Sequence, residues 1–401
     1  MKILQINSVC GVGSTGRIAT DLHAVLKTAG HESMIAYGRD KPLNCDRTIK
    51  IGKQFDVYMH VAKTRFFDRH GFGSKNATRK LIKEIEKYQP DLIHLHNLHG
   101  YYLNVEILFN YLKKLKKLIV WTLHDCWAFT GHCAHFEYAK CTCWQMGGDH
   151  HCIQKKEYPT SWWLNNSKNN YKRKKKAFTG VENLTIVTPS EWLASYVKQS
   201  FLKEYPIKII NNGIDLDIFK PQRSDFEAKN KLYNRFMILG VTNSWNQKKG
   251  LDYFLELAQT ISWNEVIVLV GLSEEQKLNL PSKILGITRT DSVKALAEIY
   301  ATADVFVNPT LEDSFPTTNL EALASGTPVI TFDTGGSPES VTKDVGFVTK
   351  QGDLEALIKK INQIKRNGKI YYSKKARNRA ETFYDKNDRF NDYLHLYQQL
   401  A

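Results

Sequence analysis

The segment ADVFVNPTLEDSFPTTNLEALASGTPVI, residues 303–330, contains the unit that decides the fold. Residues 305–308 form a short apolar run typical of a buried strand, and residues 328–332 repeat that pattern. Between them, a polar loop leads into a helix that ends at Gly326. A strand, a helix and a second strand in this order predict two parallel strands joined by a crossover helix.

The polar loop of this segment predicts a ligand site. Glu312 and Asp313 follow the first strand, at the carboxyl edge of the sheet where ligands of open α/β folds lie. The backbone N–H groups of a helix start favour phosphate. Glu321, one turn further in, is placed to accept hydrogen bonds from two ribose hydroxyls, so the segment indicates a nucleotide-linked substrate. An alternative stays open: Thr318 and Glu321 have the spacing of a capping box, in which the glutamate only satisfies a helix-end N–H group.

The bulk composition predicts a folded protein with more than one domain. A length of 401 residues corresponds to two or three domains, and 42% hydrophobic with 24% charged residues is ordinary for a soluble globular protein. The sequence has no apolar run of about 18 residues and no secretory signal at its start. Seven cysteines without such a signal indicate reduced thiols. We therefore expect a cytoplasmic protein.

The net charge of +15 predicts an anionic partner: nucleic acid, acidic lipid or a phosphorylated substrate. Basic residues alternate with apolar ones in YLKKLKKL (111–118), and YKRKKKAF (171–178) holds five consecutive basic residues near Trp162 and Trp163. Such stretches suit an anionic membrane surface, so we expect a peripheral protein at the inner face of the membrane. The alternative is a solvated helix face. Nucleic acid is not expected as a partner, because a recognisable recognition module is missing.

Short strand patterns alternate with helical ones along the chain, which predicts an α/β fold with two Rossmann-like, doubly wound parallel sheets. A first series of strands begins with KILQINSV and ends with KIIN, and a second begins with FMILGVT near Phe236. We place the first domain at 1–205 and the second at 206–383. The amphipathic helix expected at 384–401 is predicted to pack back on the first domain.

Three motifs follow expected strands at the ligand edges of these sheets. Residues 11–16, GVGSTG, match G-x-G-x-x-G; a dinucleotide site would also need an acid, for which only Asp40 is available, and the loop could equally face a sugar or phosphate. His124 and Asp125 end a strand and could orient a hydroxyl or transfer protons, unless the histidine is only bonded within the fold. Lys248 and Lys249 are placed to neutralise a departing diphosphate.

A group of cysteines and histidines raises the question of structural zinc. The spacing is irregular, so ordinary thiols remain the alternative. The thiols that we consider as ligands are Cys133, Cys141, Cys143 and Cys152, with Cys126, His132, His135, His150 and His151 nearby.

The motifs together resemble the large retaining glycosyltransferase family 4, with its two-domain glycosyltransferase-B architecture in which two sheets face a central cleft. The resemblance covers nearly the whole chain and is closest to bacterial enzymes that build capsule or O-antigen polysaccharide. It rests on GVGSTGRIATDL, PDLIHLHNLHGYYLN, VWTLHDCWAFTGHC, TPSEWL, NNGIDLDIFKP, KKGLDYF and LEDSFPTTNLEALASGTPVITFDTGGSPE.

The resemblance implies roles for individual residues. Glu321 would bind the ribose and Asp313, where the family usually has glutamate, the donor sugar. His124 would contact that sugar at the reaction centre. Ser244 stands where the family usually has arginine, so Lys249 would bear more of the phosphate charge. The further residues expected to bind the donor are Gly13, Ser14, Lys248, Ser314, Thr317 and Thr318, with Gly16 and Arg17 on the acceptor side.

The function that we predict is retaining transfer of a sugar, of hexosyltransferase type, from a nucleotide diphosphate sugar to a saccharide hydroxyl, with a lipid-linked oligosaccharide as acceptor. The catalytic residues would be His124, Lys249 and Asp313. A cofactor is not expected, and a catalytic metal is not expected because the sequence offers no Asp-x-Asp signature. The alternatives are a nucleotide-sugar 2-epimerase of the same architecture and an NAD-dependent oxidoreductase.

Overall fold

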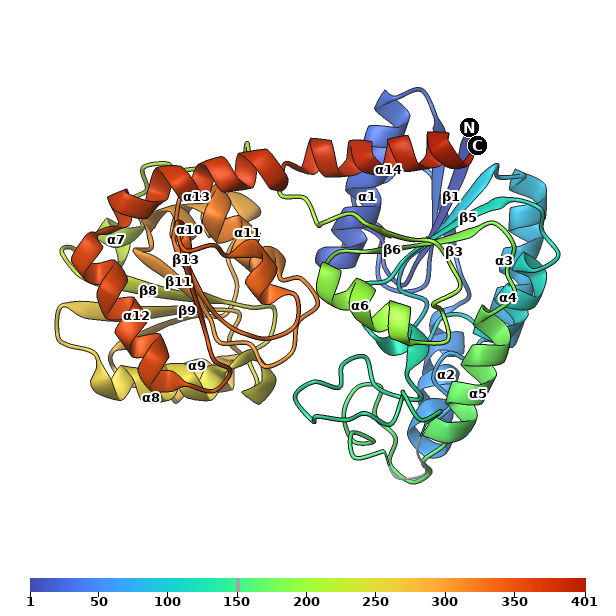
Figure 1. The fold of residues 1–401 in the computed structure, drawn as a ribbon, viewed down its shortest axis with the longest axis horizontal. Helices are drawn as coiled ribbons and strands as arrows, with labels where there is room; N and C mark the ends of the chain where they lie inside the picture. The colour runs from blue at the N-terminus through green and yellow to red at the C-terminus, as the bar shows by residue number, and fades with distance from the viewer. Residues whose placement is uncertain (149–151) are drawn as a thin grey trace. The chain divides into compact units, whose positions relative to one another are not determined.

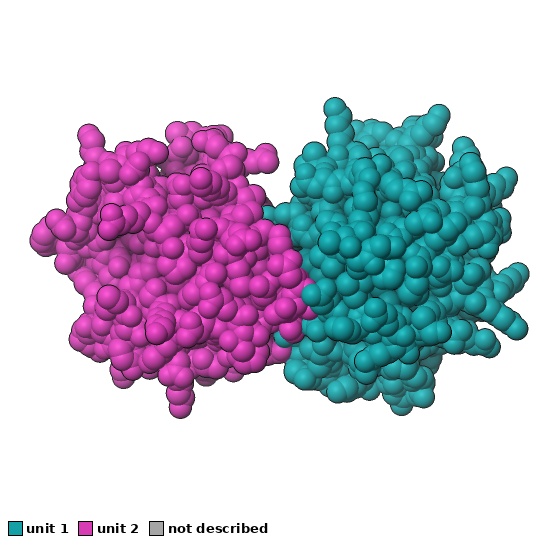
Figure 2. Space-filling view, turned by 90° about the horizontal axis from the view of Figure 1, so that it is seen from above, with its two compact units in different colours: residues 1–211, 390–401 teal, residues 212–389 magenta. Residues whose placement is uncertain are grey.

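The computed structural model describes residues 1–148 and 152–401, and these residues divide into two compact units. The first unit contains Met1–Asn211 and Phe390–Ala401, and the second contains Asn212–Arg389 (Figure 2). Each unit is built on its own fully parallel sheet with helices on both faces (Figure 1). The predicted fold class, two Rossmann-like doubly wound sheets, is therefore confirmed.

The sheet of the first unit has seven strands in the order β3-β2-β1-β4-β5-β6-β7. Every neighbouring pair is parallel; in the central pair, for example, Ile3 of β1 lies opposite Leu92 of β4. The short strand β3 was not foreseen. The strands are β1 (Lys2–Asn7), β2 (Glu32–Tyr37), β3 (Thr48–Lys50), β4 (Leu92–Leu95), β5 (Leu118–Thr122), β6 (Leu184–Thr188) and β7 (Ile207–Ile209).

Helices cover both faces of this sheet. On one face, α1 (Gly13–Thr28) and α14 (Lys386–Leu400) pack their apolar side chains, such as Leu22 and Phe390, on Ile3 and Leu92. The other face is covered by α3 (Lys75–Tyr88), α4 (Val105–Leu112), α5 (Ser167–Phe178) and α6 (Glu191–Gln199). The helix α2 (Gln54–Phe67) was not predicted, and a short turn, η1 (Trp127–Phe129), follows β5.

The sheet of the second unit has six strands in the order β10-β9-β8-β11-β12-β13, all parallel. The crossover unit 303–330 is present as predicted, with α11 (Thr317–Ala324) joining β11 to β12. The strands are β8 (Phe236–Val241), β9 (Glu265–Val270), β10 (Ile284–Ile287), β11 (Val305–Asn308), β12 (Val329–Phe332) and β13 (Gly346–Thr349).

Two apolar layers hold the helices of the second unit to its sheet. Leu357, Ile361 and Ile364 of α12 (Leu354–Asn367) recur at helical spacing and pack with α8 (Leu251–Thr260) on one face. On the other face, α10 (Val293–Thr302), α11 and α13 (Lys369–Phe383) bury small and apolar side chains. The shorter elements are α7 (Phe226–Asn230), η2 (Gln247–Lys249), α9 (Glu274–Leu278) and η3 (Ser337–Ser340).

Each sheet has one position where the winding of the chain reverses. It lies between β1 and β4 in the first unit and between β8 and β11 in the second. At such a position the loops leaving adjacent strands diverge to opposite faces of the sheet, which opens a crevice at the carboxyl edge. The two positions therefore indicate where each unit can bind a ligand.

The run of five basic residues at 172–176 is only partly exposed. The run 172–176 lies in α5, but the side chain of Lys174 is buried and its Nζ donates to the Trp127 carbonyl oxygen at 2.7 Å. Arg173 pairs with Glu106 through two hydrogen bonds of 2.6 and 2.8 Å. Two of the five charges therefore serve the fold. Among the described residues, the helices are too short or too polar to span a membrane.

The C-terminal helix is anchored to the first unit by buried hydrogen bonds as well as by apolar contacts. The Tyr397 hydroxyl lies 2.6 Å from His94 Nδ1, and His94 Nε2 lies 2.8 Å from Thr122 Oγ1. The Tyr393 hydroxyl bonds the same threonine at 3.1 Å. These side chains link α14 to β4 and β5, beneath the sheet edge that carries the histidines discussed below.

We expect Tyr397→Phe to lower the free energy of unfolding of the first unit by about 1–3 kcal/mol, because Nδ1 of the buried His94 would lose this partner. Chemical denaturation followed by circular dichroism measures the change. Tyr58→Phe is the control, since the Tyr58 side chain is exposed in the same unit. Equal stability of the two variants would show that this hydrogen bond does not anchor α14.

Candidate functional site

The loops that leave β8 and β11 interlock at the reversal point of the second sheet. The amide of Leu311 donates to the carbonyl oxygen of Lys248 at 2.8 Å. Gly250 allows this close approach: its φ is +79°, and a methyl group in its place would lie 2.3 Å from the Pro309 carbonyl oxygen. The sequence KKG after β8 thus packs directly on the chain that leads to the acidic loop.

Two ion pairs form where these loops meet. Lys249 Nζ lies 2.8 Å from Asp313 Oδ2 and also donates to the Glu312 carbonyl oxygen at 3.2 Å. Lys248 Nζ lies 3.0 Å from Glu312 Oε2, whose carboxylate is nearly fully buried. The predicted lysines and acids are therefore brought together, but as partners of one another. A bound phosphate would compete with the carboxylates for the ammonium groups.

The start of α11 lies at the same edge of the sheet. Pro316 occupies the N-cap position and Thr317 is the first helical residue. Thr318 is already inside the helix, so the capping-box alternative for Thr318 and Glu321 is wrong. The first turn of α11 contains no acidic side chain that could accept hydrogen bonds from the N–H groups at the start of this helix. Glu321 is buried, at 4% exposure.

Two buried oxygen atoms of the acidic loop lack a hydrogen-bond partner among the described residues. They are Ser314 Oγ and Glu312 Oε1. Ser314 is 4% exposed and directly precedes Phe315, whose amide is held by Asp313 Oδ1 at 3.2 Å. Buried polar atoms without a partner are uncommon in folded proteins and point to a group that binds there.

A buried amide network supports the start of α11. The Asn319 side-chain nitrogen donates to Ser337 Oγ and Ser340 Oγ, both at 3.0 Å, and its oxygen accepts from Asn308 at 2.9 Å. This network joins the helix to the end of β11 and to η3. Asn319 was not singled out from the sequence, although an asparagine inside an apolar helix is the kind of residue that marks such a network.

Among the three glycines of the loop in the first unit, Gly13 is the most exposed to solvent. A methyl group at Gly11 would lie 2.3 Å from the Leu43 carbonyl oxygen, and one at Gly16 would lie 3.1 Å from the Gly11 nitrogen. These two glycines serve packing. Gly13 has φ +66° with no described heavy atom near its missing methyl group, and Gly13 and Ser14 are exposed. The half-buried Arg17 follows on α1.

His124 lies just past β5, in a row of three histidine rings. Its Nε2 is 3.3 Å from His96 Nδ1, and the rings stack with centroids 5.6 Å apart. The His96 ring in turn lies against the His94 ring, tilted by 35°, with the ring centroids 4.0 Å apart. Burial lowers the pKa of His124 to about 4, so its imidazole is neutral at physiological pH. His124 is thus suited to hydrogen bonding and not to carrying positive charge.

Asp125 pairs with His99 and not with its sequence neighbour His124. Asp125 Oδ2 lies 2.7 Å from His99 Nε2, and Oδ1 accepts from the Trp127 amide at 2.9 Å. Burial alone would raise the pKa of Asp125, but the charge of His99 and its hydrogen bond outweigh it and lower the pKa. His99 Nδ1 lies 3.0 Å from the Tyr158 hydroxyl. A role for His99 was not predicted from the sequence.

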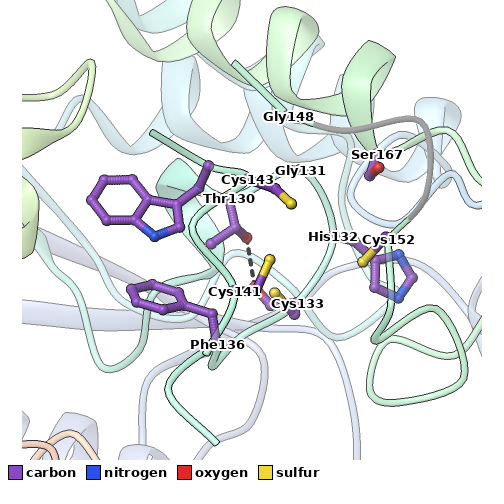
Figure 3. A pocket seen from close by; sticks show the side chains of 11 residues that line it. Thr130, Gly131, His132, Cys133, Phe136, Cys141, Cys143, Gly148, Cys152 and Ser167 are labelled. Atoms are coloured by element: carbon purple, nitrogen blue, oxygen red, sulfur yellow. Dashed lines mark hydrogen bonds between the residues drawn. The ribbon is translucent and has the colours of Figure 1, made fainter. Parts of the chain in front are cut away.

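The four cysteines considered for zinc line one pocket, together with His132 (Figure 3). The burial of Cys133 raises the pKa of its thiol, and the neighbouring Cys152 and Cys141 add to the shift. In the described residues, however, these thiols do not bring three ligand atoms within 4.8 Å of one another. His150 and His151, which also belonged to the prediction, lie outside the described residues. The cysteine pocket therefore does not by itself give a formed metal site.

Two family models match the chain, one in each half. Residues 15–218, just over half of the chain, match the model described as Glycosyltransferase Family 4. Residues 235–367 match the model described as Glycosyl transferases group 1. The first match begins at the end of the glycine loop and contains the histidine row, and the second contains the lysine–carboxylate pairs and α11.

Curated relatives show the same similarity. The chain is 24% identical over 431 aligned residues to the candidate colanic acid biosynthesis glycosyl transferase WcaC of Escherichia coli (strain K12), with 100% of both proteins covered. It is 29% identical over 181 residues to UDP-Gal:alpha-D-GlcNAc-diphosphoundecaprenol alpha-1,3-galactosyltransferase of Escherichia coli, covering 40% of this chain and 46% of that protein.

Solved structures share the fold at low identity. Sucrose-phosphate synthase from Thermosynechococcus elongatus superposes with a TM-score of 0.73 at 18% identity, covering 100% of this chain and 99% of that one. Anabaena HepE, in complex with UDP-glucose, gives a TM-score of 0.65 at 17% identity, with 98% and 99% covered.

We expect Gly335→Ala to weaken binding of a nucleoside diphosphate about tenfold, a loss of about 1.4 kcal/mol. Gly335 has φ +59°, and the added methyl group would lie 1.7 Å from the Asp313 carbonyl oxygen, so the acidic loop must shift. Calorimetric titration measures the affinity.

Gly368→Ala is the matched control. Its φ is +75°, so the backbone strain is similar, but no described heavy atom lies within 4 Å of the new methyl group. Equal loss of affinity in both variants would mean that general destabilisation, and not displacement of Asp313, is responsible.

Proposed function

The chain belongs to glycosyltransferase family 4, and we propose that it transfers a sugar from a nucleotide diphosphate sugar to a hydroxyl of a saccharide acceptor with retention of the anomeric configuration. The observation that carries the proposal is the convergence of two lysines, two carboxylates and the start of α11 at the reversal point of the second sheet. This edge offers positive groups for a diphosphate and acceptors for sugar hydroxyls within one set of loops.

The nucleotide and the sugar of the donor would be bound by different residues of this set. Glu321, buried within α11, would accept hydrogen bonds from the ribose hydroxyls. The N–H groups of Thr317 and Thr318 and the unpartnered hydroxyl of Ser314 would donate to the diphosphate. The Anabaena HepE structure with UDP-glucose supports a nucleotide sugar as donor.

The Lys249–Asp313 pair would exchange partners when the donor binds. In the free protein each charge neutralises the other at 2.8 Å. A diphosphate would draw Lys249 away, and Asp313 would then be free to accept hydrogen bonds from the donor sugar. Lys248 and its buried partner Glu312 would keep a second ammonium group beside the leaving group.

The transfer breaks the bond between the anomeric carbon and the diphosphate oxygen. Negative charge develops on the diphosphate, where Lys249 and the start of α11 would stabilise it more strongly than in the bound donor. The acceptor hydroxyl would attack from the face that the diphosphate leaves, and a diphosphate oxygen would take its proton. This route needs no protein base, and we assign none.

His124 would bind the donor sugar as a neutral hydrogen-bonding group. Its depressed pKa keeps the imidazole uncharged down to a pH of about 4, so it does not compete with the lysines for the diphosphate. His96 lies against Nε2 of His124 and fixes the orientation of the His124 ring. Protonation of His124 therefore lies outside the physiological pH range.

The acceptor would be a lipid-linked oligosaccharide in the synthesis of a cell-surface polysaccharide. The relatives named for colanic acid biosynthesis and for a diphosphoundecaprenol acceptor support this proposal. The exposed backbone of Gly13 and Ser14, with Gly16 and Arg17 behind it, would contribute to the diphosphate and acceptor contacts. We assign the acceptor side to the first unit and the nucleotide sugar to the second.

Exposed aromatic side chains in the first unit support a peripheral position at an anionic membrane. Trp162 and Trp163 are 57% and 72% exposed, and both contact Phe66 of α2 in an edge-to-face arrangement. Along α2, Phe55 and Tyr58 are also exposed. The guanidinium of Arg65 lies 5.9 Å from the Trp162 ring. Aromatic rings beside basic groups are typical of surfaces that enter the headgroup region of a bilayer.

We expect Glu321→Ala to weaken donor binding by about 10- to 100-fold, because hydrogen bonds to a charged group are worth roughly 1.5–3 kcal/mol. A panel of UDP-, GDP-, dTDP- and CDP-sugars, titrated calorimetrically, identifies the donor and measures the loss. Products formed with and without an acceptor then separate the transferase from the 2-epimerase alternative.

The control for this experiment is Glu256→Ala, which removes an exposed glutamate from α8 of the same unit. It should leave the affinity unchanged. If a folded Glu321→Ala protein binds the donor as the parent does, Glu321 has only a structural role and the assignment of the ribose site is incorrect.

We expect the double variant Trp162→Ser with Trp163→Ser to bind vesicles of anionic phospholipid about tenfold more weakly or worse, since burial of one large apolar side chain is worth roughly 1.5–3 kcal/mol. Cosedimentation measures the bound fraction. Trp263→Ser is the control, because Trp263 is 86% exposed in the second unit. Equal binding by all three proteins would exclude this surface as the membrane contact.

A further inference from the structure

A group of metal-ligating side chains lies apart from the residues assigned above to the donor. His23 belongs to α1, while Cys45 and Asp46 lie in the loop between β2 and β3. Among residues 1–148 and 152–401, this is the one group of three or more such side chains whose ligand atoms all lie within 4.8 Å of one another. We propose that His23, Cys45 and Asp46 bind a zinc ion that joins α1 to this loop.

The imidazole of His23 is already oriented for such a role. Its Nδ1 lies 2.9 Å from Ser33 Oγ, in the buried strand β2, and its Nε2 lies 2.9 Å from Asp46 Oδ1. A second-sphere hydrogen bond of this kind fixes the ring and leaves the other nitrogen for the metal. His23 itself is 2% exposed, so the ring has little freedom to turn away.

The charges around the group suit a metal cation. Cys45 supplies the sulfur of the group, and the thiolate is the form of cysteine that binds metals. Lys27 Nζ lies 2.5 Å from Asp46 Oδ2 and leaves Oδ1 facing the histidine. Zinc would take the position between Nε2 and Oδ1 that a proton occupies in the free protein.

The donor set selects zinc among common divalent ions. Imidazole, thiolate and carboxylate together are ligands of zinc, whereas magnesium and calcium prefer sites made of oxygen alone. A water molecule would complete the tetrahedron, because Cys45 is only partly buried and Asp46 is exposed to solvent. Cys10 packs against Cys45 from the buried side and would hydrogen-bond its sulfur.

Zinc here would stabilise the glycine loop indirectly. Leu43, two residues before Cys45, donates its amide to the Cys10 carbonyl oxygen at 3.2 Å and packs against Gly11. A metal that fixes Cys45 and Asp46 to α1 would therefore also restrain Leu43, and with it the contact between Leu43 and the residues Cys10 and Gly11. The inference does not depend on the proposed transferase reaction.

The test measures metal in the whole 401-residue chain. The chain is stripped with a chelator, reloaded with zinc chloride, desalted and assayed for zinc, and a second sample is titrated with cobalt(II). We expect bound zinc, and a cobalt spectrum with a thiolate-to-metal charge-transfer band. Cys45→Ser and Asp46→Asn should each weaken metal binding at least tenfold, and Cys45→Ser should also remove the thiolate band.

The control is the double variant Cys141→Ser with Cys143→Ser, which alters the cysteine pocket of Figure 3 and should keep both the zinc and the band. Because Asp46 is exposed, Asp46→Asn is expected to fold, and circular dichroism verifies this. Unchanged zinc content in Cys45→Ser and Asp46→Asn, or loss of zinc only in the cysteine-pocket variant, would overturn the proposal. Absence of a thiolate band in the parent protein would do the same.

Discussion

The parallel pairing of β8 with β11 is the constraint on which the candidate site depends. Parallel neighbours point their carboxyl ends in one direction, so the loops after both strands must meet at one edge of the sheet. Here those loops carry opposite charges, and they meet as Lys248–Glu312 and Lys249–Asp313. The sheet brings together residues that are more than sixty positions apart in the chain.

Pairing the charges before a ligand arrives also lets them coexist in a partly buried place. Two lysines alone would repel each other, and an unpaired Glu312 carboxylate at 6% side-chain exposure would be costly to bury. Neutral pairs avoid both costs. The same arrangement makes an anionic ligand with hydroxyl groups the natural competitor, because it can offer a partner to the lysines and to the carboxylates together.

Strand positions could be predicted from the sequence wherever a strand is buried on both faces. The apolar runs of β8, β9 and β11 are four to six residues long, which fits a buried strand and is too short for a typical helix. The alternation of such runs with helical segments along the chain predicts parallel sheets. The strand β3 escaped prediction because it has three residues, none of them fully buried. The helix α2 escaped because several of its aromatic residues face solvent, which blurs the apolar stripe.

The sequence indicates which polar residues follow the strands at these edges, but it does not indicate their partners. His124 and Asp125 are adjacent in sequence, yet adjacent residues at the end of a strand point in different directions. They therefore meet different histidines, His96 and His99, which come from the end of β4 and the loop after it. Likewise, the spacing of Thr318 and Glu321 fits a capping box, but the start of α11 is set by Pro316 one residue before the helix.

The reversal points of the two sheets differ in the chemistry that they offer. In the second unit the point carries ammonium and carboxylate groups in pairs, together with the start of a helix. In the first unit it carries backbone from a glycine loop and histidines such as His124, whose burial keeps the imidazole neutral.

In the proposed reaction, negative charge develops on the leaving diphosphate, so positive groups are needed there. A neutral imidazole such as that of His124 can bind a sugar hydroxyl without competing with the lysines for the diphosphate. The paired lysines of the second unit and the neutral His124 of the first unit therefore suit different parts of the donor. Both units share one kind of topology, in which the loops after the strands can differ in sequence while the sheets that position them stay the same.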